Sequence, residues 1–101
     1  MEAKAPSRGP NDGLVRRTVT VVNRRGLHAR AAARFVKLAA KFNADISVAK
    51  DGTEVSGLSI MGLMMLAAGP GTEIEIRAKG AEAEGAIAAL DALIANRFDE
   101  E

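Results

Sequence analysis

The residue best suited to chemistry near neutral pH is His28, the single histidine of the sequence. It follows Gly26-Leu27 and immediately precedes a stretch whose pattern predicts a helix. Backbone N–H groups in the first turn of a helix have no partner within the helix, and the helix dipole there favours negative charge. A phosphoryl group on the His28 ring could therefore rest on the N–H groups of Ala29 and Arg30. The same positive end favours a neutral ring, whose lone pair can attack phosphorus.

Positive charge gathers around this histidine. The stretch from Arg24 to Phe42 contains no acidic residue and six basic ones, namely Arg24, Arg25, Arg30, Arg34, Lys37 and Lys41. The Arg30 guanidinium can take phosphate oxygens in a fork, and the field of the whole cluster attracts anions or acidic protein surfaces. Two plainer interpretations stay open, a helix-start histidine without chemistry and a solvated basic helix face.

Ser59 is a second candidate, because it precedes a short helical stretch over residues 59–67. As an N-cap, its hydroxyl would accept a hydrogen bond from a backbone N–H of the first turn. Alternatively it is a phosphorylation site, since a helix N-terminus tolerates a phosphate that adds about two negative charges.

The helical stretch that follows Ser59 is too apolar for every side chain to face inward. Its apolar residues are Ile60, Met61, Leu63, Met64, Met65 and Leu66. We expect some of them to be exposed, and exposed methionine-rich surface suits the docking of several partners. The alternative that the whole set forms core beneath a loop stays open.

Composition narrows the function classes. A chain of 101 residues with net charge +1 makes one small domain. Without cysteine and with one histidine it has no disulfide framework, thiolate zinc site or multi-histidine cluster, so we expect no metal or cofactor. No apolar run is long enough to span a membrane, and the first residues lack a secretory pattern. We therefore expect a cytoplasmic protein without membrane insertion. The lack of Trp and Tyr argues against nucleic-acid binding through a stacking sheet.

Hydrophobic periodicity predicts the elements that position these residues. We expect a flexible tail over residues 1–14 and a folded domain over residues 15–101. Alternating patterns predict strands at 15–22, 45–50, 53–56 and 72–79, with a hairpin turn at Asp51-Gly52. Helical patterns predict helices at 29–42, 59–67 and 81–96, and we expect Asp99-Glu100-Glu101 to be a solvated acidic end. The order βαββαβα indicates a two-layer α+β domain.

Two inward-facing stripes define the predicted helical core. The first helix buries Ala32, Phe35, Val36, Ala39 and Ala40. The last helix buries Ala83, Ala86, Ile87, Leu90, Leu93 and Ile94.

Two segments of the sequence resemble a known family. The run Gly26-Leu27-His28-Ala29-Arg30 is similar to the active-site segment of HPr, the histidine phosphocarrier of the phosphoenolpyruvate-dependent phosphotransferase system. The run from Leu58 to Met64 resembles the regulatory serine segment of that family, and the resemblance covers about residues 15–96. One departure is Ala31, where the family usually has a proline that pre-sets φ in the first turn.

The resemblance implies an open-faced β-sandwich with a four-stranded antiparallel sheet covered on one face by helices. It implies that His28 accepts phosphate through Nδ1 from phosphorylated enzyme I and hands it to an enzyme IIA-type acceptor, with Arg30 stabilising the phosphate. It implies that Ser59 is the target of an HPr kinase/phosphorylase. The protein would then be a monomeric carrier and not an enzyme. Its docking residues would be Ile60, Met61, Leu63, Met64 and Arg34.

Two alternative functions stay open. Within the family, the same His28 chemistry could serve a regulatory relay of a nitrogen-related phosphotransferase system without sugar transport. From another class, the chain could be a non-catalytic basic module that binds nucleic acid or an acidic protein.

Overall fold

The computed structural model describes residues 13–100, and its elements follow the predicted order βαββαβα. A short 3₁₀ turn, η1, follows the last helix. The elements are β1 (Leu14–Thr20), α1 (Ala29–Ala39), β2 (Asp45–Lys50), β3 (Thr53–Ser56), α2 (Ile60–Met65), β4 (Glu73–Lys79), α3 (Ala83–Ala95) and η1 (Arg97–Asp99).

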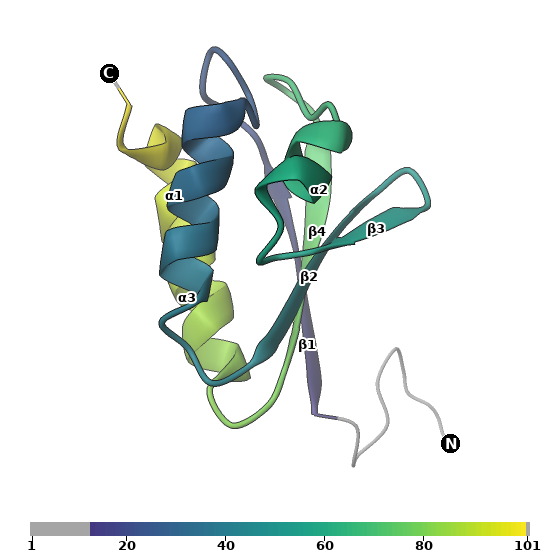
Figure 1. The fold of residues 1–101 in the computed structure, drawn as a ribbon, viewed down its shortest axis with the longest axis vertical. Helices are drawn as coiled ribbons and strands as arrows, with labels where there is room; N and C mark the ends of the chain where they lie inside the picture. The colour runs from purple at the N-terminus through teal and green to yellow at the C-terminus, as the bar shows by residue number, and fades with distance from the viewer. Residues whose placement is uncertain (1–12, 101) are drawn as a thin grey trace.

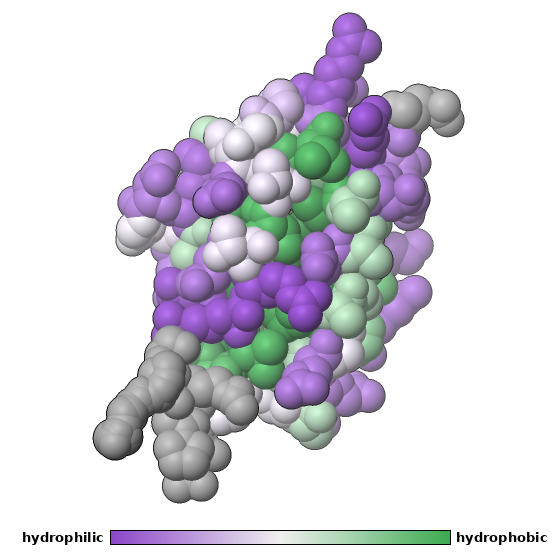
Figure 2. Space-filling model, turned by 180° about the vertical axis from the view of Figure 1, so that it is seen from behind, coloured by the Kyte–Doolittle hydropathy of each residue, from purple (hydrophilic) through white to green (hydrophobic). Residues whose placement is uncertain are grey.

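The four strands form one antiparallel sheet in the order β1-β4-β2-β3, with the helices packed on one side (Figure 1). In the register, Val19 of β1 lies opposite Ile74 of β4, and Val48 of β2 lies between Ile76 of β4 and Val55 of β3. Seen from behind, the surface has apolar patches that are bordered and separated by hydrophilic residues (Figure 2). The predicted α+β sandwich with an open sheet is confirmed.

The core lies between the sheet and the helices. Every residue of the predicted α3 stripe is buried, and in α1 the predicted Ala32, Phe35 and Ala39 are buried. Ala40 was predicted to face inward but is exposed, because α1 ends at Ala39 and Ala40 caps it. Ala31 is fully buried, although the predicted stripe did not include it.

The observed helices and strands differ from the predicted ones mainly at their first and last residues. The predicted bounds of β2 and β3 agree with the structure, and the turn between these strands has positive φ at both Asp51 and Gly52, as a tight hairpin requires. The predicted tail is too long by at least one residue, because Leu14 already pairs with Lys79 in the ladder of β1 and β4. Residues 1–12 of that tail lie outside the described residues.

As far as Glu100, the C-terminal segment is not the solvated acidic end that its composition suggests; Glu101 lies outside the described residues. Phe98 is fully buried, and Nη1 of Arg34 in α1 donates to the Phe98 carbonyl oxygen at 2.5 Å. The segment therefore folds back over α1 because an apolar anchor holds it there. Among residues 13–100, no helix is long and apolar enough to cross a bilayer.

The loop before α1 depends on Gly26. Gly26 has φ +63°, and a Cβ there would lie 2.2 Å from the carbonyl oxygen of Ala68. The neighbouring Leu27 N–H donates to the same oxygen at 2.9 Å. This position therefore needs glycine both for its backbone conformation and for space.

Replacing Gly26 with alanine should lower the free energy of unfolding markedly. A left-handed alanine costs about 1–2 kcal/mol, and displacing Ala68 should add about 1–3 kcal/mol. Gly52→Ala is the matched control, because Gly52 also has positive φ (+84°) but nothing within 4 Å of its Cβ position. Urea unfolding of both variants measures the difference, and equal losses would show that the close approach to Ala68 contributes nothing.

Candidate functional site

His28 is the N-cap residue of α1, as the sequence predicts. Its backbone is extended (φ −75°, ψ 178°), its carbonyl oxygen accepts from Ala32 N–H at 2.9 Å, and its side chain makes no capping bond. The ring is thus not used to close the helix, and it is partly exposed at the positive end of α1. The backbone N–H groups of Ala29 and Arg30 lie in the first turn, where the helix provides no acceptor.

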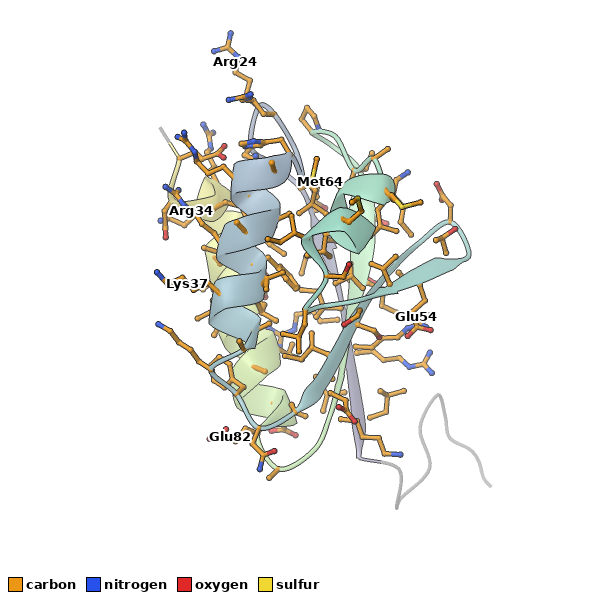
Figure 3. All side chains as sticks on the ribbon, viewed as in Figure 1. Arg24, Arg34, Lys37, Glu54, Met64 and Glu82 are labelled. Atoms are coloured by element: carbon orange, nitrogen blue, oxygen red, sulfur yellow. The ribbon has the colours of Figure 1, made fainter. Side chains whose placement is uncertain are left out.

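A hollow of about 450 Å³ opens beside His28. Figure 3 shows two of its arginines, Arg24 on the loop that precedes α1 and Arg34 on the outward side of α1. The arginines that line the hollow create a positive field that attracts anions. Its lining consists of Arg24, Arg25, His28, Arg30, Arg34, Asp99 and Glu100.

Glu100 is the site residue that the sequence analysis missed. Its Oε2 lies 2.5 Å from Nε2 of His28, and both side chains are only 18% exposed. The expected positive field around the histidine is partly offset, because the folded-back segment brings two acidic side chains to the hollow that four arginines line. The available signal was Phe98, an apolar residue after the last helix that predicts a segment anchored on the core.

Asn23 holds Glu100 from the other side. Its buried amide nitrogen donates to Oε1 of Glu100 at 3.1 Å and to the carbonyl oxygen of Gly26 at 2.9 Å. Asn23 Oδ1 is buried and has no hydrogen-bond partner among the described residues. The orientation of the amide is therefore set by the two acceptors of its nitrogen. Asn23 thus links the loop before His28 to the segment that carries Glu100.

The contacts of Glu100 also determine its charge. Burial raises the pKa of its carboxyl, but hydrogen bonds with His28 and Asn23 and the charges of His28 and Arg34 outweigh burial, so the pKa is lowered. Glu100 is therefore a carboxylate at neutral pH.

Ser59 is the N-cap of α2, and that interpretation of the sequence is confirmed. Its Oγ accepts a hydrogen bond from Gly62 N–H at 2.9 Å. The side chain is partly buried, and Gly62 leaves room for it, since a Cβ on Gly62 would lie 3.0 Å from Ser59 Oγ.

The apolar surface of α2 is exposed in part. Met61 is 71% and Met65 is 76% exposed, whereas Leu63, which we expected among the docking residues, is fully buried. The docking prediction for Leu63 is wrong, because Leu63 lies on the side of this short helix that packs into the core. We name the exposed set the α2 patch; it consists of Leu58, Ile60, Met61, Met64 and Met65.

A second hollow joins the α2 patch to the histidine. It is lined by His28 and Arg25 on one side and by Met64 and the chain after α2 on the other. A partner that reaches the His28 ring would therefore also contact Met64, whose position on α2 is visible in Figure 3.

The open face of the sheet carries a separate charged cluster. Arg77 contacts Glu54 at 3.1 Å and Glu75 at 2.6 Å, and Ser47 donates to Glu54 at 2.6 Å. The hydrogen bond from Ser47, with help from Arg77, lowers the pKa of Glu54. Among residues 13–100, no group of three or more His, Asp or Glu side chains could hold a metal ion.

The comparisons with known proteins agree on one family. The model of the PTS HPr component phosphorylation site matches residues 15–96. Phosphocarrier protein HPr of Cupriavidus necator is 44% identical over 87 residues, covering 86% of this chain and 98% of that protein. HPr of Pseudomonas aeruginosa is 46% identical over 83 residues, covering 81% and 92%. The crystal structure of HPr-C-His from Thermoanaerobacter tengcongensis matches with TM-score 0.82 and 44% identity, covering 86% and 98%.

These matches and the fold define a phosphocarrier of the phosphotransferase system, a protein that carries a phosphoryl group and is not itself a catalyst. The chain belongs to the HPr family. The family assignment excludes the interpretation of the chain as a basic module unrelated to phosphoryl transfer.

Removing the Ser59 cap should destabilise the protein. Ser59→Ala leaves Gly62 N–H without its acceptor, and the expected loss is about 1 kcal/mol of unfolding free energy. Ser59→Asp keeps an acceptor oxygen at the N-cap and should stay within about 0.5 kcal/mol of the unsubstituted protein. Urea unfolding followed by circular dichroism measures both, and equal losses for the two variants would contradict the capping role.

Proposed function

We propose that His28 is the residue that accepts a phosphoryl group from phosphorylated enzyme I and passes it to an enzyme IIA-type acceptor. The observation that carries the proposal is the position of its partly exposed ring, at the N-terminus of α1 and in a hollow lined by four arginines. An anionic group on this ring meets the helix dipole and a positive field at the same place.

The chemistry needs little beyond positioning and charge. Phosphoryl transfer passes through a loose transition state with charge spread over three equatorial oxygens. The N–H groups of Ala29 and Arg30 and the Arg30 guanidinium would bind these oxygens, while His28 acts first as nucleophile and then as leaving group. Arg30 is exposed, so its side chain can reach an oxygen without breaking a core contact.

Partners would dock on the α2 patch beside the histidine. Ile60, Met61 and Met64 remain the proposed docking residues, since all three are exposed. Arg34, the remaining proposed docking residue, lies on the outward side of α1, where it lines the His28 hollow and one of its nitrogens is engaged by the Phe98 carbonyl. Enzyme I and the acceptor would use the same patch in turn.

Ser59 would be the regulatory site, phosphorylated by an HPr kinase/phosphorylase. It caps the helix that carries the α2 patch, so a phosphate there would place negative charge beside the docking residues. The Ser59 hydroxyl oxygen already accepts a hydrogen bond from Gly62 N–H, so phosphorylation would take place on the capping oxygen itself.

A second candidate is a relay for a nitrogen-related enzyme IIA without sugar transport. Ala31 favours it, because it stands in the first turn of α1 where the family usually has proline. Competition between the two acceptor types for the phosphorylated protein would distinguish them. In either role we expect a cytoplasmic monomer.

His28→Ala should abolish labelling by enzyme I and phosphoenolpyruvate, because it removes the nucleophile while the fold survives. The label on the unsubstituted protein should be acid-labile and alkali-stable, as expected of a phosphoramidate. Labelling is measured with radioactive phosphoenolpyruvate, and circular dichroism verifies the fold. Label retained on a folded His28→Ala protein would refute the assignment of His28.

Met61→Lys should raise the KM of enzyme I for this protein about tenfold, because a charge on the α2 patch must be desolvated when the partner docks. Ala92→Lys is the control, since it adds the same charge at an exposed position of α3. Steady-state phosphorylation with varied carrier concentration gives both KM values. A similar increase in the two variants would show an effect of net charge and not of docking.

A further inference from the structure

Glu100 and His28 form a short polar contact within the hollow. Oε2 of Glu100 lies 2.5 Å from Nε2 of His28, and each side chain is 18% exposed. The contact leaves Nδ1 as the ring nitrogen not engaged by Glu100. The hydrogen bond therefore distinguishes the two nitrogens of a ring that could otherwise react at either one.

The position of Glu100 is fixed by three independent contacts. Asn23 donates to its second oxygen at 3.1 Å, the buried Phe98 anchors the segment, and Arg34 donates to the Phe98 carbonyl at 2.5 Å. Arg97, Phe98 and Asp99 all have positive φ, between 54° and 62°, a conformation unfavourable for residues with side chains. Such a backbone persists only where its surroundings determine it, so the segment is held in place and is not a relaxed tail.

The protonation states follow from the charges that face the ring. Burial raises the pKa of Glu100, but its hydrogen bonds and positive neighbours have the larger effect. The pKa is therefore lowered overall, and Glu100 remains a carboxylate. A carboxylate only accepts hydrogen bonds, so the proton in the contact belongs to Nε2. The other charged groups of the hollow are Arg24, Arg25, Arg30, Arg34 and Asp99.

We propose that Glu100 is a positioning residue that keeps the proton on Nε2 of His28 throughout the phosphoryl cycle, so that Nδ1 takes and releases the phosphoryl group. The inference rests on the proposed function of His28. It gives Glu100 the part that a buried carboxylate has when it orients a reacting histidine.

The transfer then balances without any proton leaving the ring. The Nδ1 lone pair forms the bond to phosphorus while the bond from phosphorus to the donor atom of enzyme I breaks, and that electron pair stays with the donor. His28 becomes a phosphorylated imidazolium whose positive charge faces the Glu100 carboxylate. On transfer to the acceptor, the Nδ1–phosphorus bond breaks and its pair returns to Nδ1, leaving a neutral ring with the proton still on Nε2.

Two variants test the proposal. Glu100→Gln keeps the shape and an oxygen acceptor but removes the charge, whereas Glu100→Ala removes both. We expect both to slow phosphoryl transfer from enzyme I by about tenfold or more, as for loss of a charged hydrogen bond. In ¹⁵N spectra of the phosphorylated protein, the Nε2 signal of the His28 ring should differ between both variants and the unsubstituted protein, because its hydrogen-bond partner has changed.

Glu84→Gln is the matched control, because it removes an equal charge at an exposed position of α3 that does not line the hollow. If it slows transfer as much as Glu100→Gln, the effect is one of net charge and the proposal is overturned. A Glu100→Gln protein with the rate and ring spectrum of the unsubstituted protein would also overturn it, since Glu100 would then serve only as an anchor.

Failure of this proposal is distinguishable from failure of the proposed function. In the first case the unsubstituted protein and the Glu100 variants are labelled equally well, and His28→Ala is not labelled. In the second case His28→Ala is labelled, or the unsubstituted protein is not, and both proposals are overturned.

Discussion

The site depends on one backbone constraint, which is the close approach of the chain before α1 to the chain after α2. Leu27 N–H donates to the Ala68 carbonyl at 2.9 Å, and Gly26 leaves no room for a Cβ against the same oxygen. This contact determines where α1 begins, and therefore makes His28 its N-cap. It also fixes the α2 patch relative to the ring, because Ala68 follows α2 closely in the chain. The chemistry of one histidine and the surface that partners would contact are thus set by the same hydrogen bond.

Local patterns predict most of the fold, because the fold is largely consistent with local preference. The alternation in residues 45–56 and the Asp51-Gly52 turn gave the bounds of β2 and β3, and the α3 stripe is buried as predicted. The prediction that Leu63 docks partners was wrong because α2 has only six residues and carries apolar side chains on several sides. Periodicity in so short a helix does not indicate which side chain packs into the core.

The sequence shows His28 and Ser59 through their helix-start positions, but it does not show Glu100. The contact joins residues that are 72 positions apart. It depends on three successive left-handed residues, Arg97, Phe98 and Asp99, of which Arg97 and Phe98 are types that rarely adopt that conformation. Burial of Phe98 stabilises what local preference opposes, and composition alone made the same segment look like a solvated end.

A phosphocarrier has to give up its phosphoryl group as readily as it takes it, and this requirement limits how the site can be charged. Arginines and helix N–H groups stabilise the phosphoryl oxygens, and with nothing to oppose them they would favour retention. A carboxylate on the far nitrogen acts through the ring: it stabilises the positive charge of the phosphorylated ring and keeps on Nε2 the proton that the ring needs in order to leave uncharged. With the proton kept on Nε2, the ring leaves as neutral imidazole and not as the strongly basic imidazolate. In both transfers the ring enters or leaves as neutral imidazole with its proton on Nε2, so Glu100 would assist acceptance and release alike, while the difference between donor and acceptor sites sets the direction of transfer.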